Sequence, residues 1–310
     1  MKELQLDILA VDGPLLRTYL SVMHSHGYRP RRIFRLINDA GEGATPVLRH
    51  FPAFLRMPLL KYRQNFSETS WVRGLTLRYS ASWKKYLEAA GHATQLSDTV
   101  IAGIADVLQR VSPSPLFLCP VIDIPARGLG DPRLRERLIA YKADTLLSTS
   151  DAIAPASLLH IPGLKTLLMH PGVLPYKDRF SEPFLRGSDM LFWSALIREK
   201  AAVSGIYMEP GIDEGEVFYC KEFPLPQLPD IAEKVPGDSY YLIRAFVSPV
   251  YRAKGLLDVI ENVTRDGGDF HAIPSMPQDT GKGISLYIMH PWLREKAVAK
   301  MTPARSSGEV

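Results

Sequence analysis

The first 37 residues alternate apolar runs with one helical run, and this alternation constrains the fold more than any other feature of the chain. Residues 6–11 (LDILAV) and 31–37 (RRIFRLI) are strand-like, and residues 15–27 have helical spacing that ends on Gly27. Two strands joined by a helix at this spacing favour a parallel sheet with a right-handed crossover. The first turn contains a single glycine, Gly13, so a dinucleotide fingerprint is missing and no nicotinamide or flavin cofactor is expected.

The same alternation returns in the middle of the chain. We expect strands at 115–119 (PLFLC), 143–148 and 164–169, and helices at 131–142 and 187–200. Two further strand-like runs, SGIYMEP and EVFYCKEF, follow the last helix. The sequence therefore predicts an α/β fold with a parallel sheet, mixed at one edge and flanked by helices.

Two segments depart from this pattern. Residues 39–95 mix glycine, proline and aromatic residues without a clean period, which predicts an irregular insertion with one or two helices. The proline-rich residues 223–230 (FPLPQLPD) indicate a boundary. We therefore expect an α/β domain over residues 1–226 and a helix-rich C-terminal extension over residues 227–310.

Composition excludes several classes of function. The 310 residues carry 37 basic and 33 acidic side chains, a formal net charge of +4, so no nucleic-acid partner is expected. Cys119 and Cys220 cannot form a disulfide framework and have no metal-ligand spacing, so no metal is expected. Neither a signal peptide nor an apolar run long enough to span a membrane is evident, which predicts a soluble cytoplasmic protein. Nothing in the sequence specifies an oligomeric state.

Open α/β sheets bind ligands beyond the carboxyl ends of their strands. Three loops rich in glycine or proline follow expected strands there, STSDAIAP, HPGVLPY and EPGIDEG, and they carry Asp151, His170 and Asp213. An imidazole that titrates near neutral pH, beside a carboxylate that orients it, suits general acid–base catalysis. A histidine after a strand is, taken alone, more often structural than catalytic.

The order of these landmarks resembles the folate-dependent formyltransferase family, which includes glycinamide-ribonucleotide, methionyl-tRNA and sugar-nucleotide formyltransferases. HPGVLP is similar to the second half of the family motif Asn-x-His-Pro-Ser-x-Leu-Pro, and GIDEG to its aspartate loop. The run ADTLLSTSDAIAPASLLHIPG resembles the strand, pterin-contacting loop and short helix that precede them. The resemblance is good over roughly 114–226.

The resemblance implies transfer of a formyl group from 10-formyltetrahydrofolate to an amine of a small metabolite, without metal or covalent enzyme intermediate. The family's catalytic histidine falls on His170, which would help to hold the oxyanion, and its catalytic aspartate falls on Asp213, which would assist proton transfer. The donor's pterin would lie against two loops, whose residues are Ser148, Thr149, Ser150, Asp151, Ala152 and Ile153, with Glu209, Gly211 and Ile212.

One position departs from the family motif. Leu168 stands where the family has an asparagine two residues before the histidine, and a leucine cannot donate a hydrogen bond to an oxyanion. Another donor, such as Thr149, Ser150 or a backbone N–H, could replace it, or the enzyme could transfer a different group. The alternatives are a formyltetrahydrofolate hydrolase on the same fold and a catalytically degenerate protein that only binds its ligand.

Overall fold

The computed structural model describes most of this 310-residue chain. The described residues are 1–11, 13–38, 52, 55, 58–59, 74–80, 82–110, 116–150, 154–175, 185–211, 213–229, 238–278 and 284–302. Most of the predicted insertion at 39–95 lies outside them, although its last part forms the helix α4 (Trp83–Ala93).

The predicted opening unit of strand, helix and strand is present. It consists of β1 (Lys2–Ala10), α1 (Pro14–Ser25) and β2 (Tyr28–Asn38), and the two strands pair in parallel. Pro14 occupies the first turn of α1, where a missing N–H costs nothing. Gly27 turns the chain into β2 at a φ of 78°, a conformation that glycine adopts without strain.

The central elements agree with the prediction in all but one case. They are β3 (Val121–Ala126), α6 (Pro132–Ala140), β4 (Thr145–Ser148), α7 (Ala156–Leu159) and β5 (Lys165–His170). The strand predicted at 115–119 is wrong, because residues 116–119 belong to no strand and β3 begins after Pro120. An apolar run without periodicity does not distinguish a strand from another packed segment. The observed strand β3 contains Pro125, a residue that is uncommon within strands.

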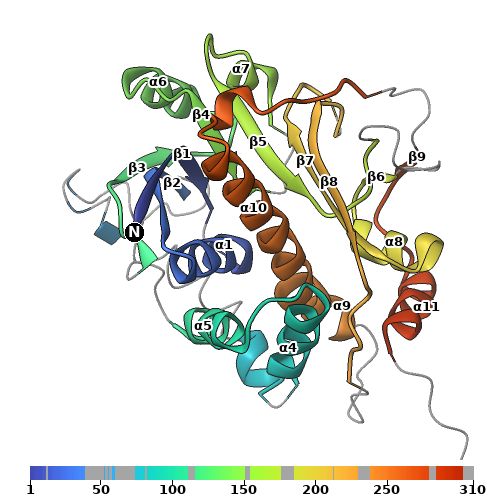
Figure 1. The fold of residues 1–310 in the computed structure, drawn as a ribbon. Coiled ribbons are helices and arrows are strands. Elements are labelled where there is room, and N and C mark those ends of the chain that lie inside the picture. Colours follow the sequence, from blue (N-terminus) through green and yellow to red (C-terminus); the bar gives the residue numbers. More distant parts are fainter. Residues whose placement is uncertain are drawn as a thin grey trace, which may run out of the picture.

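The main sheet has seven strands in the order β3-β2-β1-β4-β5-β7-β8 (Figure 1). Its last two strands are β7 (Ala201–Tyr207) and β8 (Val217–Phe223). The first five strands are parallel, whereas β7 runs antiparallel to β5, and β8 antiparallel to β7. The prediction of an α/β fold with a mostly parallel, mixed-edge sheet is therefore confirmed.

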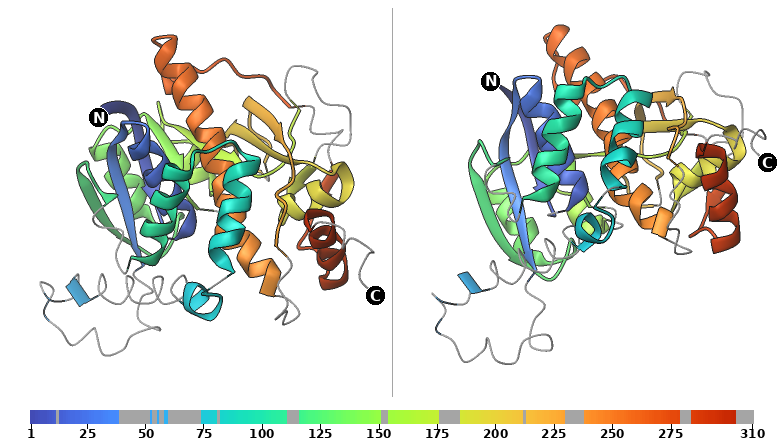
Figure 2. Two further views of the ribbon diagram at one scale, coloured as in Figure 1. Left: turned by 60° about the horizontal axis from the view of Figure 1, so that its bottom comes forward. Right: turned by 90° about the horizontal axis from the view of Figure 1, so that it is seen from below.

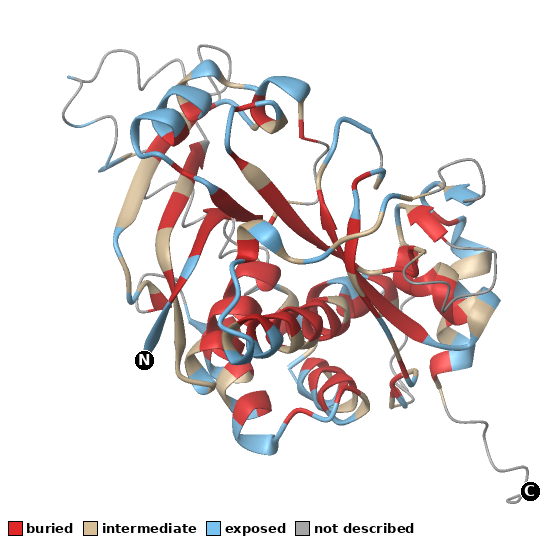
Figure 3. Ribbon diagram, turned by 45° about the horizontal axis from the view of Figure 1, so that its top comes forward, coloured by how far each residue is buried: buried red, intermediate tan, exposed pale blue. Residues whose placement is uncertain are grey.

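Helices cover both faces of this sheet, and the central strands β4, β5 and β7 are accordingly buried almost throughout (Figure 3). One face packs against α1, α5 (Asp98–Gln109) and the long helix α10 (Ser248–Arg265), which Figure 2 shows side by side. The other face packs Phe34, Ile124 and Leu146 against α6 and the segment around α7.

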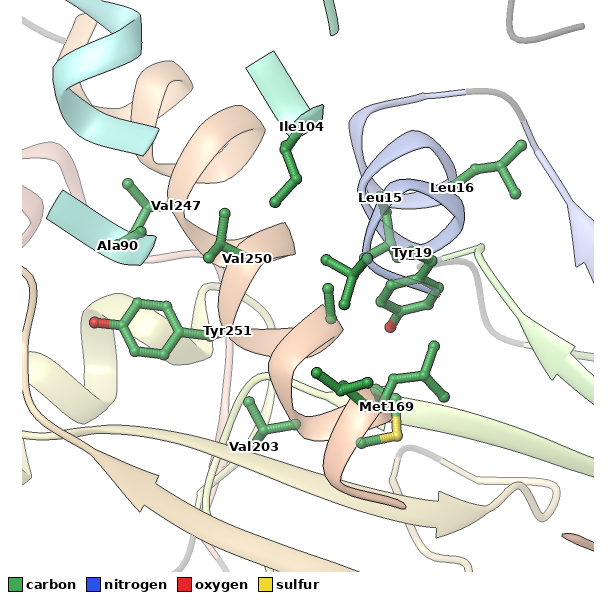
Figure 4. Packing of buried hydrophobic residues seen from close by; sticks show 14 of the residues in the cluster. Leu15, Leu16, Tyr19, Ala90, Ile104, Met169, Val203, Val247, Val250 and Tyr251 are labelled. Atoms are coloured by element: carbon green, nitrogen blue, oxygen red, sulfur yellow. The ribbon is translucent and has the colours of Figure 1, made fainter. Parts of the chain in front are cut away.

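Helix α10 lies in the same apolar cluster as β5, β7 and α1 (Figure 4). It continues α9 (Asp238–Leu242) and a π-helical turn, η3 (Ile243–Val247). Gly255 allows the close approach to the sheet, because a Cβ there would lie 2.8 Å from Val203 and 3.2 Å from Met169. The domain division at residue 226 stays a prediction. Helix α10, which follows this boundary in the sequence, packs into the apolar core beside the sheet.

A second, two-stranded sheet lies beside the end of β5. Its strands β6 (Leu185–Gly187) and β9 (Ile284–Leu286) are parallel, and the helices α8 (Met190–Arg198) and α11 (Pro291–Met301) follow them and pack together. A Cβ on Gly187 would lie 2.1 Å from the Leu286 carbonyl oxygen, so the two strands require a glycine at this crossing. The C-terminal segment is thereby brought to the loop that follows His170.

Candidate active site

His170 is the last residue of β5, and it opens into a cleft of about 540 Å³ at the carboxyl edge of the sheet. Thr149 after β4 and Val11 after β1 line the same cleft, as the parallel order of these strands requires. Asp213 also lines it, from the loop between β7 and β8. The two predicted catalytic residues are thus brought together beside the loop that follows β4.

His170 and Asp213 form a close pair. Their Nδ1 and Oδ1 atoms are 3.4 Å apart, and the side chains are 3% and 13% exposed. Asp213 Oδ2 accepts a hydrogen bond of 2.9 Å from the Gly187 backbone N–H. His170 Nε2 has no hydrogen-bond partner among the described residues. The carboxylate therefore lies beside one ring nitrogen, Nδ1, whereas the other, Nε2, is buried beside Gly172.

Asp213 adopts a left-handed backbone conformation with a φ of 56°. Gln278 holds this turn, because its amide Nε2 donates hydrogen bonds to the backbone oxygens of Asp213, at 2.8 Å, and Gly215, at 2.5 Å. Sequence reasoning did not find Gln278, which belongs to the C-terminal segment.

The loop after His170 is fixed by Ser204 of β7. Its hydroxyl donates to the Gly172 carbonyl oxygen at 2.7 Å and accepts from the Leu174 N–H at 2.9 Å. Gly172 itself leaves room for the imidazole, because a Cβ there would lie 2.7 Å from His170 Nε2 and 3.2 Å from the Leu185 carbonyl oxygen. The glycine of the HPG sequence is therefore a requirement of this packing.

A buried arginine of α10 is hydrogen-bonded to the backbone of β5. Arg252 of α10 is 4% exposed, and its Nε donates a 2.6 Å hydrogen bond to the backbone oxygen of Met169, the residue before His170. Arg252 also lines the cleft. No sequence signal pointed to it, because it is an ordinary polar position of an amphipathic helix.

A smaller cavity of about 270 Å³ adjoins the cleft. The predicted donor-binding residues Ser150, Glu209 and Gly211 line it. Five residues line both cavities, so the two meet beside the catalytic pair: Ser150, Leu168, Gly187, Ser188 and Asp213.

Other predicted donor-binding residues lie elsewhere. Ser148 is 2% exposed and lines neither of these two cavities, and Thr149 lines only the larger one. The remaining predicted contacts lie outside the described residues: Asp151, Ala152, Ile153 and Ile212.

The Thr149 side chain is hydrogen-bonded to the backbone at the end of β1. Its hydroxyl accepts a hydrogen bond from the Val11 N–H at 3.0 Å and donates to the Leu9 carbonyl oxygen at 3.1 Å. These bonds join the ends of β4 and β1. The hydroxyl is therefore engaged, which speaks against Thr149 as a substitute oxyanion donor.

Leu168 faces the site with an apolar side chain. It is 9% exposed, packs with Ile206 and Val217, and lines both cavities two residues before His170. Its position matches that of the family's asparagine, and it adds an apolar wall where that asparagine would offer an amide.

The described part of the chain contains no group of three or more His, Cys, Asp or Glu side chains arranged to hold a metal ion. Among its helices, none combines the length and the apolar character that crossing a membrane requires.

Comparison with curated proteins finds a methionyl-tRNA formyltransferase of Syntrophus aciditrophicus (strain SB). It is 29% identical over 112 residues, which make up 36% of this chain and 33% of that protein. The match thus spans about a third of the relative's length. No family model matches the chain.

Solved structures of low sequence identity are also similar. HypX from Aquifex aeolicus in complex with tetrahydrofolic acid has a TM-score of 0.39 at 18% identity, over 62% of this chain and 30% of that one. A 4-N formyltransferase from Francisella tularensis has a TM-score of 0.41 at 11% identity, over 93% of this chain and 76% of that one. Phosphoribosylglycinamide formyltransferase from Anaplasma phagocytophilum has a TM-score of 0.40 at 11% identity, over 93% of this chain and 100% of that one. The chain resembles formyltransferases, as its motifs predicted.

Proposed function

We propose that this protein transfers a formyl group from 10-formyltetrahydrofolate to an amine of a small metabolite. The observation that carries the proposal is the His170–Asp213 pair, 3.4 Å apart where two cavities meet. Formyl transfer needs a donor and an acceptor on either side of one proton-transferring group. Two adjoining cavities that share Asp213 and Leu168 fit this requirement.

The smaller cavity suits the pterin end of the donor. It is lined by the backbone of Gly187 and Gly211, by Ser150 and Glu209, and by the apolar side chains Leu168, Ala154, Ile206 and Met208. A flat ring with polar edges is bound by such a combination of apolar walls and a few polar groups. The larger cavity, on the other side of His170, would take the acceptor.

His170 would move the proton. When the donor is bound, it supplies the formyl carbon. The bond from the amine nitrogen to that carbon forms, the bond to the folate nitrogen breaks, and one proton passes from the amine to the departing nitrogen. With Asp213 beside Nδ1, we assign proton transfer to Nε2 of His170, which is buried in this structure and would have to become accessible when the substrates bind. The protonated ring would then donate to the formyl oxygen.

Leu168 favours a second candidate, a protein that binds the folate without efficient catalysis. Removing one oxyanion donor typically costs roughly 100- to 1,000-fold in turnover, and Thr149 is already engaged. Hydrolysis of the donor, with water in place of the amine, is the enzymatic alternative. Product analysis separates these outcomes, because transfer gives a formylated amine, hydrolysis gives formate, and binding alone gives neither.

Calorimetric titration with 5-formyltetrahydrofolate, a stable analogue of the donor, tests the donor site. We expect micromolar binding that Glu209→Ala weakens, because Glu209 lines the smaller cavity. The matched control is Glu136→Ala, on the exposed side of α6, which should bind like the unchanged protein. Absence of binding, or equal binding by both variants, would count against the proposed donor site.

A further inference from the structure

The larger cavity has a wall that belongs to the C-terminal segment. Tyr241, Arg244, Ser248 and Arg252 line it together with His170. These residues lie on α9, η3 and α10, which follow one another without interruption. The acceptor side of the cleft is therefore shaped by a part of the chain that lies outside the resemblance at 114–226.

The two carboxylates in the described lining of this cleft, Asp189 and Asp213, are engaged. Asp189 is 3% exposed; its Oδ1 accepts a 3.0 Å hydrogen bond from the Tyr240 hydroxyl, and its Oδ2 accepts from the Met289 N–H and lies 3.4 Å from Arg294 Nη2. Asp213 is held by His170 and Gly187. Neither carboxylate is an ion-pair partner of the arginine at the mouth of the cleft.

That arginine is Arg244, and it is held in place by a neutral group. Its Nη1 donates a 2.9 Å hydrogen bond to the Tyr240 hydroxyl, and its guanidinium lies over the Tyr240 ring at 5.5 Å from the centroid. Within the described part of the chain Arg244 forms no ion pair, although it is solvent-exposed on the cleft wall. A guanidinium held in this way loses little conformational entropy when it binds an anion.

Tyr240 is itself fixed by Asp189 and by Arg294, whose guanidinium lies 3.7 Å from the centre of the tyrosine ring. The second cleft arginine, Arg252, is buried nearer to His170, where it bonds the Met169 backbone. The two arginines that line the cleft, Arg244 and Arg252, thus belong to one wall, which η3 and α10 form.

We propose that Arg244 forms an anion subsite for the acceptor, on the wall of the cleft that it shares with Arg252. The amine acceptor would accordingly carry a carboxylate or a phosphate group. That the ligand is the acceptor of a formyl group rests on the proposed function. The subsite itself rests on the Arg244–Tyr240–Asp189 arrangement.

Three small primary amines test the inference: ethanolamine, β-alanine and O-phosphoethanolamine, which are respectively uncharged, carboxylate-bearing and phosphate-bearing apart from the amine. Transfer from 10-formyltetrahydrofolate is measured with the full chain. We expect kcat/KM for one or both anionic amines to exceed that for ethanolamine by about tenfold or more. A hydrogen bond to a charged group usually changes affinity by at least this factor. The preferred amine identifies the anion as carboxylate or phosphate.

Arg244→Gln should remove this preference, and its exposed position leaves folding unaffected. Arg265→Gln is the matched control, because it removes the same charge from an exposed position near the other end of α10. Its preference should equal that of the unchanged protein. Equal rates with all three amines, or a preference that survives Arg244→Gln, would overturn the inference.

The subsite can also be tested without transfer. If no amine is formylated, the proposed function fails for these amines, and calorimetric titration with the same three compounds decides on the subsite. Binding of an anionic amine that Arg244→Gln abolishes and Arg265→Gln retains supports it. Absence of such binding overturns it.

Discussion

His170 Nδ1 lies 3.4 Å from Asp213 Oδ1, although the two residues come from the end of β5 and from the loop after β7. The Gly187 N–H, from a third segment, bonds the other carboxylate oxygen. The pair is thus positioned by three parts of the chain. A distance slightly beyond a short hydrogen bond is common in ligand-free sites, where catalytic contacts tighten only when the substrate is bound.

The first prediction concerns this pair. His170→Ala should reduce formyl transfer by about 100-fold or more, because it removes the group that accepts and returns the proton. Asp213→Asn should also reduce it, since an amide stabilises the imidazolium less well. Circular dichroism and donor titration show whether fold and binding are retained. Full activity in either variant would contradict the assigned roles.

The second prediction concerns Gly172. Gly172→Ala should reduce transfer by roughly 10- to 100-fold, because the added methyl group displaces the imidazole and small misplacements of reacting groups are costly. Gly130→Ala is the control, as its Cβ would meet only Pro155, at an ordinary 3.7 Å. Steady-state kinetics of both variants provide the measurement, and equal rates would show that the imidazole does not need its present position.

The third prediction concerns Leu168. Leu168→Asn should raise kcat by about tenfold or more, because it supplies an oxyanion donor beside His170. The variant should lose about 1–3 kcal/mol of stability, since an amide enters an apolar cluster. Leu168→Met, which adds no donor, should show no gain in kcat. If both variants leave kcat unchanged, another group already serves as the donor.

The fourth prediction concerns the anchoring of α10. Asp258 of α10 accepts hydrogen bonds from Tyr219 and Lys221 of β8, at 2.9 and 2.7 Å, and from Lys254. Burial acts to raise the pKa of the Asp258 carboxyl, but the bonds from Lys221, Lys254 and Tyr219 outweigh it and hold the pKa below its usual value. The carboxylate therefore contributes stability above its unfolded pKa, and this contribution is lost as the pH falls through the folded value.

Asp258→Asn should accordingly lower the free energy of unfolding at neutral pH by about 1–3 kcal/mol. The difference from the unchanged protein should shrink below about pH 4, where the unfolded carboxyl becomes protonated. Urea unfolding across this range provides the measurement. Asp266→Asn, at a position 69% exposed, is the control and should have little effect. A deficit that is constant with pH would contradict the assignment.

The sequence predicted those parts of the molecule that leave a local pattern. Strand β5 and the motif at His170 are continuous in sequence, so both could be recognised without a structure. Strand β3 was missed because the prediction placed the strand on the apolar run at 115–119. β3 contains Pro125, which is tolerated because β3 is an edge strand of the sheet.

The residues that support the site could not be predicted in this way. Gln278 and Arg252 act through backbone atoms of residues far away in the sequence, and neither position shows a period, motif or charge cluster. Arg244 is equally ordinary as a sequence position. The path of α10 across the sheet brings Arg244 and Arg252 to the cleft, and the antiparallel bridge of Met276 with Val217 brings Gln278 there.

Formyl transfer is tested most directly by product analysis after incubation with 10-formyltetrahydrofolate and a panel of amines, for the unchanged protein and for His170→Ala. We expect one formylated amine for each tetrahydrofolate released, and loss of both products in the variant. Formate in place of the formylated amine, or tetrahydrofolate release that His170→Ala leaves unchanged, would contradict it.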